Sequence, residues 1–164
     1  TEAWTVPPKD ELYPYPKPEM PPLAQERSQQ GAEAFSKYFL EAYTYAIATR
    51  DLEVLHSACG SSAPFCEANA AHIQEAIDTD TYYLNYAVSD LEITGSLRGG
   101  STDRVEWGTQ LVGFVDEHSV FVERGSEVVE SGEFHFVAAV EVFWDDGWKV
   151  EDAEYVPYED VYSE

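Results

Sequence analysis

Residues 23–50 constrain the fold most, because no other part of the chain carries an apolar face over so many positions at helical spacing. The side chains of this face recur at steps of three and four: Ala32, Phe35, Phe39, Ala42, Tyr43, Ala46 and Ile47. Glu33, Lys37 and Glu41 fall away from the face. Gly31 interrupts the pattern, so we predict a packed helix over 32–49, about 27 Å long, with the preceding residues projecting or bent. Such a helix needs a sheet to pack on.

Two shorter helices are predicted after it. Asp51 is typical of an N-cap, and the helix that follows would turn Leu52 and Leu55 inward. Pro64 suits the first turn of a third helix that ends near residue 77. Its apolar stripe would consist of Phe65, Ala68, His72, Ala76 and Ile77.

From Thr81 onward the apolar period changes from helical spacing to two, which predicts strands. Alternation in one phase is followed by the opposite phase at Leu91 and Ile93, as a β-bulge near Ser89 and Asp90 would produce. Further strands are predicted over 105–115, at a weaker edge-like segment around Val120, and over 133–144. A tight hairpin at 146–147 leads into a last strand.

The order of these elements predicts an α+β fold in which three N-terminal helices pack on a curved antiparallel sheet of four or more strands. We expect a leader over 1–22, one domain over 23–156 and an acidic tail over 157–164. Residues 7–22 hold seven of the nine prolines, which excludes helix and central strand. This leader is either a stiff spacer or an arm on the domain surface, and its aromatic residues favour docking of its later half.

The charge of the chain excludes some partners. Thirty-two acidic against nine basic residues give a formal net charge of −23, which repels nucleic acid and anionic lipid. The acidity fits a solvated surface, and the alternative is a basic partner or a cation site. No apolar run reaches the 18 or so residues that a membrane span needs.

The two cysteines indicate a compartment. Cys59 and Cys66 are an even count at short spacing, which favours a disulfide, with a redox pair or two free thiols as alternatives. The chain starts without Met, as a mature form would after removal of a secretion signal. We therefore predict an extracellular protein.

Three segments carry a resemblance to known families: FSKYFLEAYTYAIATRDLEVL, a cysteine-bearing helical hairpin, and strands ending in VFWDDGWKVED. Together they resemble the nuclear-transport-factor-two-like cone, which is cystatin-like and occurs in polyketide cyclase-like and ketosteroid isomerase-like proteins. With the proline-rich leader and KPEMPPLAQERSQQGAEAFSKYF, residues 14–152 resemble a family of lipoproteins of high-GC Gram-positive bacteria. That resemblance implies tethering to the cell surface through a lipid anchor, although the lipid-bearing cysteine is absent from the sequence.

Enzymes of the cone fold place a histidine or carboxylate inside the cone, where burial moves its pKa toward neutrality. The strand positions that we expect to face inward hold neither, and His56, His72, His118 and His135 show no metal-ligand spacing. We predict no catalytic residues, cofactor or metal. Candidates for lining a ligand cavity are Tyr43, His72, Tyr86, Trp107 and Phe136.

We therefore expect a binding or interaction domain at the cell surface, with a small apolar ligand or a protein as partner. The alternative is a small-molecule enzyme, an isomerase or dehydratase, acting in the cone. The outer sheet face is a candidate interface and a possible homodimer contact, through His135, Val137, Ala139 and Phe143.

Overall fold

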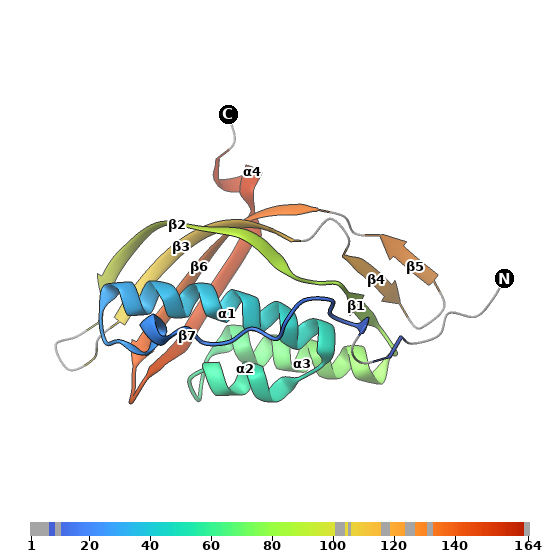
Figure 1. Ribbon diagram of the computed structural model, residues 1–164, viewed down its shortest axis with the longest axis horizontal. Helices are drawn as coiled ribbons and strands as arrows, with labels where there is room; N and C mark the ends of the chain where they lie inside the picture. The colour runs from blue at the N-terminus through green and yellow to red at the C-terminus, as the bar shows by residue number, and fades with distance from the viewer. Residues whose placement is uncertain are drawn as a thin grey trace.

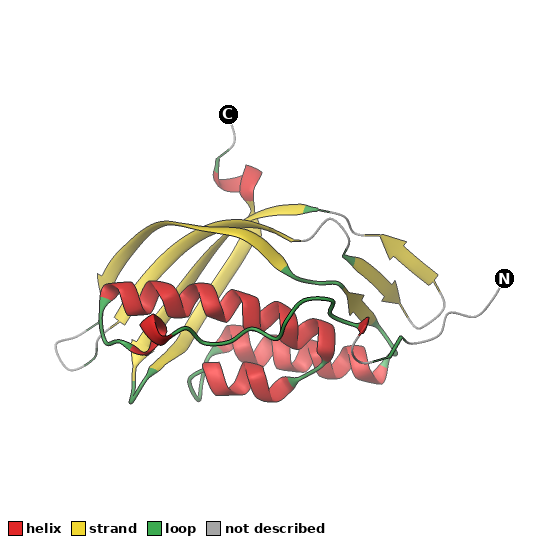
Figure 2. Cartoon of the chain, in the orientation of Figure 1, coloured by secondary structure: helices red, strands yellow, loops and turns green. Residues whose placement is uncertain are grey.

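The computed structural model describes residues 7–8, 11–100, 104, 106–115, 119–123, 127–130 and 133–162. Three helices lie against the concave side of a curved antiparallel sheet, and the chain ends on its convex side (Figure 1). Figure 2 shows the same two layers, with helices in red and strands in yellow. The predicted α+β architecture is confirmed.

Helix α1, Gln29–Thr49, lies in the hollow of the sheet. The side-chain oxygen of Ser28 accepts a hydrogen bond from the Gly31 amide at 3.0 Å and caps the helix. Its last turn ends at Arg50, which has the left-handed φ of 64°. The residues before α1 form a separate 3₁₀ turn, η2, Pro22–Gln25, so they are bent away from the long helix as predicted. The helix itself begins at Gln29 and runs through Gly31, where the sequence predicted an interruption.

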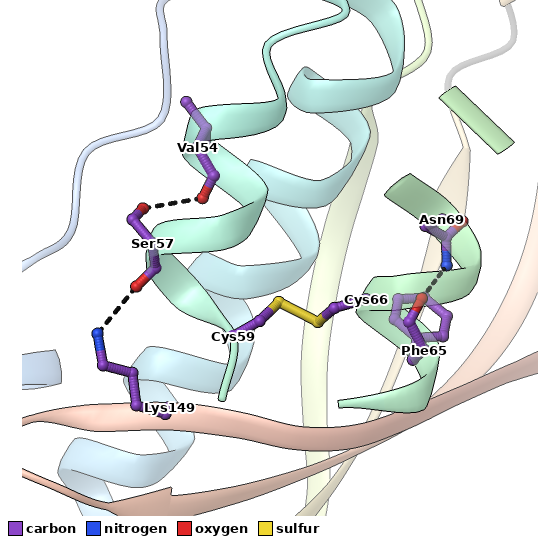
Figure 3. Close-up of a disulfide and its surroundings, with 7 residues drawn as sticks. All are labelled: Val54, Ser57, Cys59, Phe65, Cys66, Asn69 and Lys149. Atoms are coloured by element: carbon purple, nitrogen blue, oxygen red, sulfur yellow. Dashed lines mark hydrogen bonds between the residues drawn. A yellow bond between two sulfur atoms is a disulfide. The ribbon is translucent and has the colours of Figure 1, made fainter. Parts of the chain in front are cut away.

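Helices α2, Leu52–Ala58, and α3, Pro64–Asp78, form the hairpin beneath α1. The carboxylate of Asp51 accepts a hydrogen bond from the Val54 amide at 3.4 Å, as the predicted N-cap should. The predicted disulfide joins Cys59 and Cys66 and so connects the end of α2 to the first turn of α3 (Figure 3). In the same view the Lys149 ammonium donates to the Ser57 carbonyl at 3.0 Å, which ties α2 to the sheet.

The main sheet has the order β2-β3-β6-β7, with every pair antiparallel. Its strands are β2 (Val88–Gly99), β3 (Glu106–Val115), β6 (Phe134–Trp144) and β7 (Trp148–Pro157). The β2–β3 register shifts between Ser89 and Glu92, and Asp90 there has a φ of 52°. The bulge that the change of apolar phase predicted is therefore present.

A second, smaller sheet has the order β1-β4-β5 and was not predicted. It consists of β1 (Tyr82–Leu84), β4 (Val120–Glu123) and β5 (Glu127–Glu130). The alternation of apolar residues from Thr81 onward predicted one bent strand, but Asn85 adopts a φ of 56° and turns the chain between β1 and β2. Asparagine tolerates this conformation, so the alternation of apolar residues crosses a turn that period alone does not reveal.

Residues 11–21, called the strap here, run along α1 in the direction opposite to the helix (Figure 1). Leu12 is buried against Tyr82 and Val122, and its carbonyl accepts a hydrogen bond from the Asn85 amide at 3.2 Å. The ring of Tyr13 lies 5.1 Å from that of Tyr45 on α1. The described part of the leader thus docks on the domain.

Candidate functional site

The space between α1 and the concave sheet face is packed with side chains of the chain itself. Phe35 and Phe39 of α1 and Phe136 of β6 are fully buried there. Leu111 and Val140 of the facing strands are also fully buried and belong to the same cluster. Dense packing of this kind forms a core.

Three phenols meet at the edge of this core, where Tyr86 and Tyr155 pack against the buried Tyr43. The rings of Tyr86 and Tyr155 lie 6.4 Å and 6.3 Å from that of Tyr43, and the Tyr86 and Tyr155 hydroxyls share a hydrogen bond of 2.8 Å. Burial raises the pKa of all three phenols. Each therefore stays protonated at neutral pH and serves as a hydrogen-bonding group.

The structure brings three of the five predicted cavity residues together. Tyr43 packs beside Tyr86, and Phe136 contacts the same Tyr155 ring at 4.8 Å. Trp107 is half-buried near the start of β3, away from these three residues. A ligand-binding role for these residues stays a prediction.

His72 lies on the exposed side of α3, where its Nε2 is 2.8 Å from the Tyr83 hydroxyl. The stripe predicted for this helix was right for Ala76, which is buried, and for Phe65, which packs against the core. It was wrong for Ala68, His72 and Ile77, which are exposed, and it missed the buried Cys66 and Ile73. The disulfide turns Cys66 toward α2, and that rotation of the helix places His72 outward. Ile77, also predicted to be buried, is 39% exposed.

The other histidines do not form a site within the described residues. His56 is exposed, and His135 is stacked between two rings on the outer sheet face. His118 lies outside the described residues. Across the described ranges, no three side chains of the His, Cys, Asp or Glu types are grouped so that they could hold a metal ion.

A groove of about 630 Å³, called the outer groove here, lies on the convex face of β2, β3 and β6. Its floor is hollow because Gly95, Gly108 and Ala139 stand on three adjacent strands with little or no side chain. A Cβ built at Gly95 would meet no atom within 4 Å, and one at Gly108 only the Leu97 carbonyl at 4.0 Å. Leu97 stands beside this floor and is 81% exposed.

The rim of the outer groove is acidic. Glu106 and Glu141 line the groove, and the strand register places Asp152 and Glu154 of β7 on the same face. Burial and the neighbouring Glu151 carboxylate raise the pKa of Glu106, although Arg104, whose Nε lies 2.8 Å from its carboxylate, opposes the rise. A positive charge at this rim would stabilise the ionised carboxylates.

The tail covers the other end of the same face. Helix α4, Tyr158–Val161, places the Tyr158 ring 3.8 Å from His135, which stacks on Phe114 at 4.2 Å on its other side. Val137 is 4% exposed. The predicted outer interface therefore needs correction: His135 and Val137 are covered by the chain itself, and Ala139 remains exposed. Phe143 is half-buried, with the Arg104 guanidinium 4.2 Å from the centre of its ring.

Sequence reasoning did not find Leu97, Glu41 or Tyr13 as candidates for a binding surface. Leu97 had a sequence signal, since it lies between Gly95 and Gly99 in a strand, where an apolar side chain has small neighbours. The positions of Glu41 and Tyr13 depend on where the strap docks, which no local pattern encodes.

The model of a family described only as having unknown function, DUF6318, matches residues 14–154. The chain belongs to DUF6318. A comparison with curated proteins found no match. Two of the solved structures similar to this DUF6318 chain are distant in sequence.

The first is the intermembrane space region of the chloroplast protein ARC6, at 14% identity, with 80% of this chain and 98% of that chain covered and a TM-score of 0.59. The second, Bd1075 of Bdellovibrio bacteriovorus, covers 81% of this chain and 43% of that chain at 11% identity, with a TM-score of 0.39. The first similarity shows a shared fold alone. Among the described helices, none is long and apolar enough to cross a bilayer.

Proposed function

We propose that this DUF6318 chain is an extracytoplasmic binding domain that engages a basic segment of a partner protein through the outer groove. Residues 23–156 would form the domain and residues 1–22 its leader. The observation that carries the proposal is the contrast between the two sheet faces. The concave face is filled by its own aromatic side chains, whereas the convex face has an apolar hollow with exposed Leu97.

The chemistry of the partner follows from charge. Glu106 and Glu141 line the apolar floor, and Asp152 and Glu154 extend the acidic face onto β7. Arg98 is the basic residue in the groove lining, and Arg104 pairs with Glu106 at its edge. A segment with an apolar side chain flanked by lysine or arginine would bury its apolar part beside Leu97 and pair with the rim. A second copy of the chain is disfavoured, because both copies carry a formal charge of −23 and would bring like charges together.

The disulfide supports the location. Cys59–Cys66 is a structural bridge in the core of the α2–α3 hairpin, and such bridges persist in oxidising compartments. A lipid anchor upstream and membership of a nuclear-transport-factor-two-like group would fit this location. A small-molecule isomerase or dehydratase would need an inward acid or base, and the concave positions described on β3 and β6 hold none.

The proposed binding role of the outer groove can be tested by filling the groove, because a larger side chain fits there without a steric clash. Gly108→Val would place a side chain in open space on a strand, where β-branched residues are favoured. We would select a library of random dodecapeptides against the full chain and repeat the selection against this variant. Peptides that combine an apolar residue with Lys or Arg, and that lose binding to the Gly108→Val chain, are expected.

Two matched measurements complete the test. Glu75→Gln on α3 removes an exposed carboxylate far from the groove and should leave peptide binding unchanged, whereas Glu141→Gln should weaken it about threefold. Peptides that bind the filled groove equally well, or a selection that enriches no basic residue, would refute the proposal. Sedimentation that shows a dimer broken by Gly108→Val would assign the groove to a second copy instead.

A further inference from the structure

A second groove lies between the strap and the domain, and it is separate from the outer groove. This strap groove has a volume of about 680 Å³ and opens to the surface. Its lining comes from the strap, from α1 and from the segment that enters β2: Tyr13, Tyr15, Lys17, Glu19, Glu41 and Ala87.

Its strap side is aromatic. The Tyr13 and Tyr15 rings meet edge to face, with 5.5 Å between their centroids and 78° between their planes. The Tyr13 and Tyr45 rings do the same, at 5.1 Å and 90°. Perpendicular rings of this kind present a negative π face in more than one direction, and such faces attract cations.

Glu41 supplies a carboxylate beside these rings. The strap covers it, so the residue predicted to point into solvent is half-buried. In the described part of the chain its carboxylate has no ion pair or hydrogen bond. Burial raises the pKa of Glu41 against the attraction of Lys37, and burial together with Glu41 raises the pKa of Tyr13 to about 12. The Tyr13 ring therefore stays neutral, while the Glu41 carboxylate is attracted by Lys37 without forming a direct ion pair with it.

The chain itself shows which kind of group fits here. The ammonium nitrogen of Lys17 lies 5.8 Å from the centroid of the Tyr45 ring, and the same exposed side chain lines the groove. An ammonium on a flexible stem is thus already held against a tyrosine ring that packs on the groove residue Tyr13. With Glu19 and Glu41 as carboxylates and Lys17 as the ammonium, the lining keeps one excess negative charge.

We propose that the strap groove binds an organic ammonium group, with the Tyr13 and Tyr15 rings against its alkyl part and Glu41 as its counter-ion. The Lys17 ammonium lies against the neighbouring Tyr45 ring in the free chain and would compete with the ligand for the groove. A divalent metal fits less well, because hard cations take six or more oxygen ligands and the lining holds two carboxylates.

The test uses two probes that differ in charge and match in shape: choline and its neutral isostere 3,3-dimethyl-1-butanol. Both are titrated into the ¹⁵N-labelled full chain at constant chloride concentration. Choline should shift the amide signals of Tyr13, Lys17, Glu41 and Ala87 to saturation, and the isostere should leave them in place. Equal shifts with both probes, or choline shifts spread evenly over the acidic surface, would overturn the proposal.

Variants separate binding from folding. Glu41→Gln should weaken choline binding about fivefold, and Tyr13→Leu by a similar factor. Glu75→Gln, on the exposed side of α3, is the matched control and should bind like the unaltered chain. Lys17→Met should strengthen binding about twofold or more, because it removes the competing ammonium. A loss of packing would weaken binding in every variant, so a gain in the Lys17 variant shows that its ammonium competes with the ligand, through its place or its charge.

The source of the ammonium is read from a parallel titration with the peptide acetyl-Gly-Lys-Gly-amide. Tighter binding of this peptide than of choline points to a lysine of a protein partner, and the reverse order points to a free quaternary amine. If neither probe displaces Lys17, as judged by its unchanged side-chain signals, the assignment is wrong. The outer groove is not involved, so Gly108→Val should leave these titrations unchanged, whichever way the peptide selection turns out.

Discussion

Replacing Gly31 by alanine sets helix propensity against packing. Gly31 lies in the first turn of α1, where alanine is favoured over glycine by about 1 kcal/mol. A Cβ at this position would lie 1.9 Å from the Glu26 carbonyl oxygen and 3.0 Å from that of Leu23. Since real contacts stay above 3.0 Å, the Glu26 carbonyl and α1 must separate by about 1.1 Å.

That movement has a second effect. The Glu26 carbonyl accepts a hydrogen bond of 2.7 Å from the indole N–H of Trp148, a buried residue that follows the β6–β7 hairpin. A separation of this size lengthens the bond beyond useful range and leaves the indole N–H unpaired, at a cost of about 1–3 kcal/mol. Overpacking costs roughly 1–3 kcal/mol more. After the gain in propensity, we expect Gly31→Ala to lower the free energy of unfolding by about 3 kcal/mol.

Urea denaturation followed by tryptophan fluorescence and circular dichroism measures this difference. Gly95→Ala is the control, because a Cβ there meets open space and its φ is not positive. It should change stability by less than about 1 kcal/mol. A Gly31→Ala chain as stable as the unaltered chain, or more stable, would show that the close approach of η2 to α1 is not what requires glycine.

Three further outcomes are expected. Replacing Cys59 and Cys66 by alanine should lower the free energy of unfolding by about 2.5 kcal/mol, as measured in urea; no loss would mean that the closed loop contributes nothing to stability. Tyr86→Phe should destabilise by about 1–3 kcal/mol because it leaves the Tyr155 hydroxyl unpaired, whereas the double phenylalanine variant should recover much of the loss; additive losses in a double-mutant cycle would contradict this. Burial raises the folded-state pKa of Glu41, so its contribution to stability is present below the ordinary value of 4.5 and is lost as the pH rises through the folded-state value. Glu41→Gln should therefore raise the thermal midpoint at pH 7 but not below pH 4.5, and an equal gain at both would exclude titration of this carboxyl as the cause.

Local patterns predicted the elements well where one physical effect decides the conformation. The change of apolar phase between Val88 and Leu91 required a bulge, and Asp90 forms it. Asp51 caps α2 because its carboxylate can reach an amide of the first turn. These contacts join residues only a few positions apart, so the local sequence is enough to predict them.

Patterns failed where contacts distant in sequence decide. Four alanines in α3 left its stripe ambiguous, and the disulfide at Cys66 set the rotation that turns His72 outward. Glu41 is half-buried by the strap rather than exposed, because residues far ahead in the sequence pack over it. Both proposed grooves depend on such distant contacts. Of the candidate cavity residues inferred from the sequence, Trp107 lines the outer groove, and the other four line neither groove.

The course of the strap also determines how the domain responds to tension. Its contacts follow one another along α1, with Leu12 at the small sheet first, then Tyr13 at Tyr45, then Lys17. A force applied from the N-terminal side therefore breaks these contacts one after another. The force acts on α1 only after the last of them has broken. The strap would detach and extend under force while the helices and the main sheet beneath it stay folded.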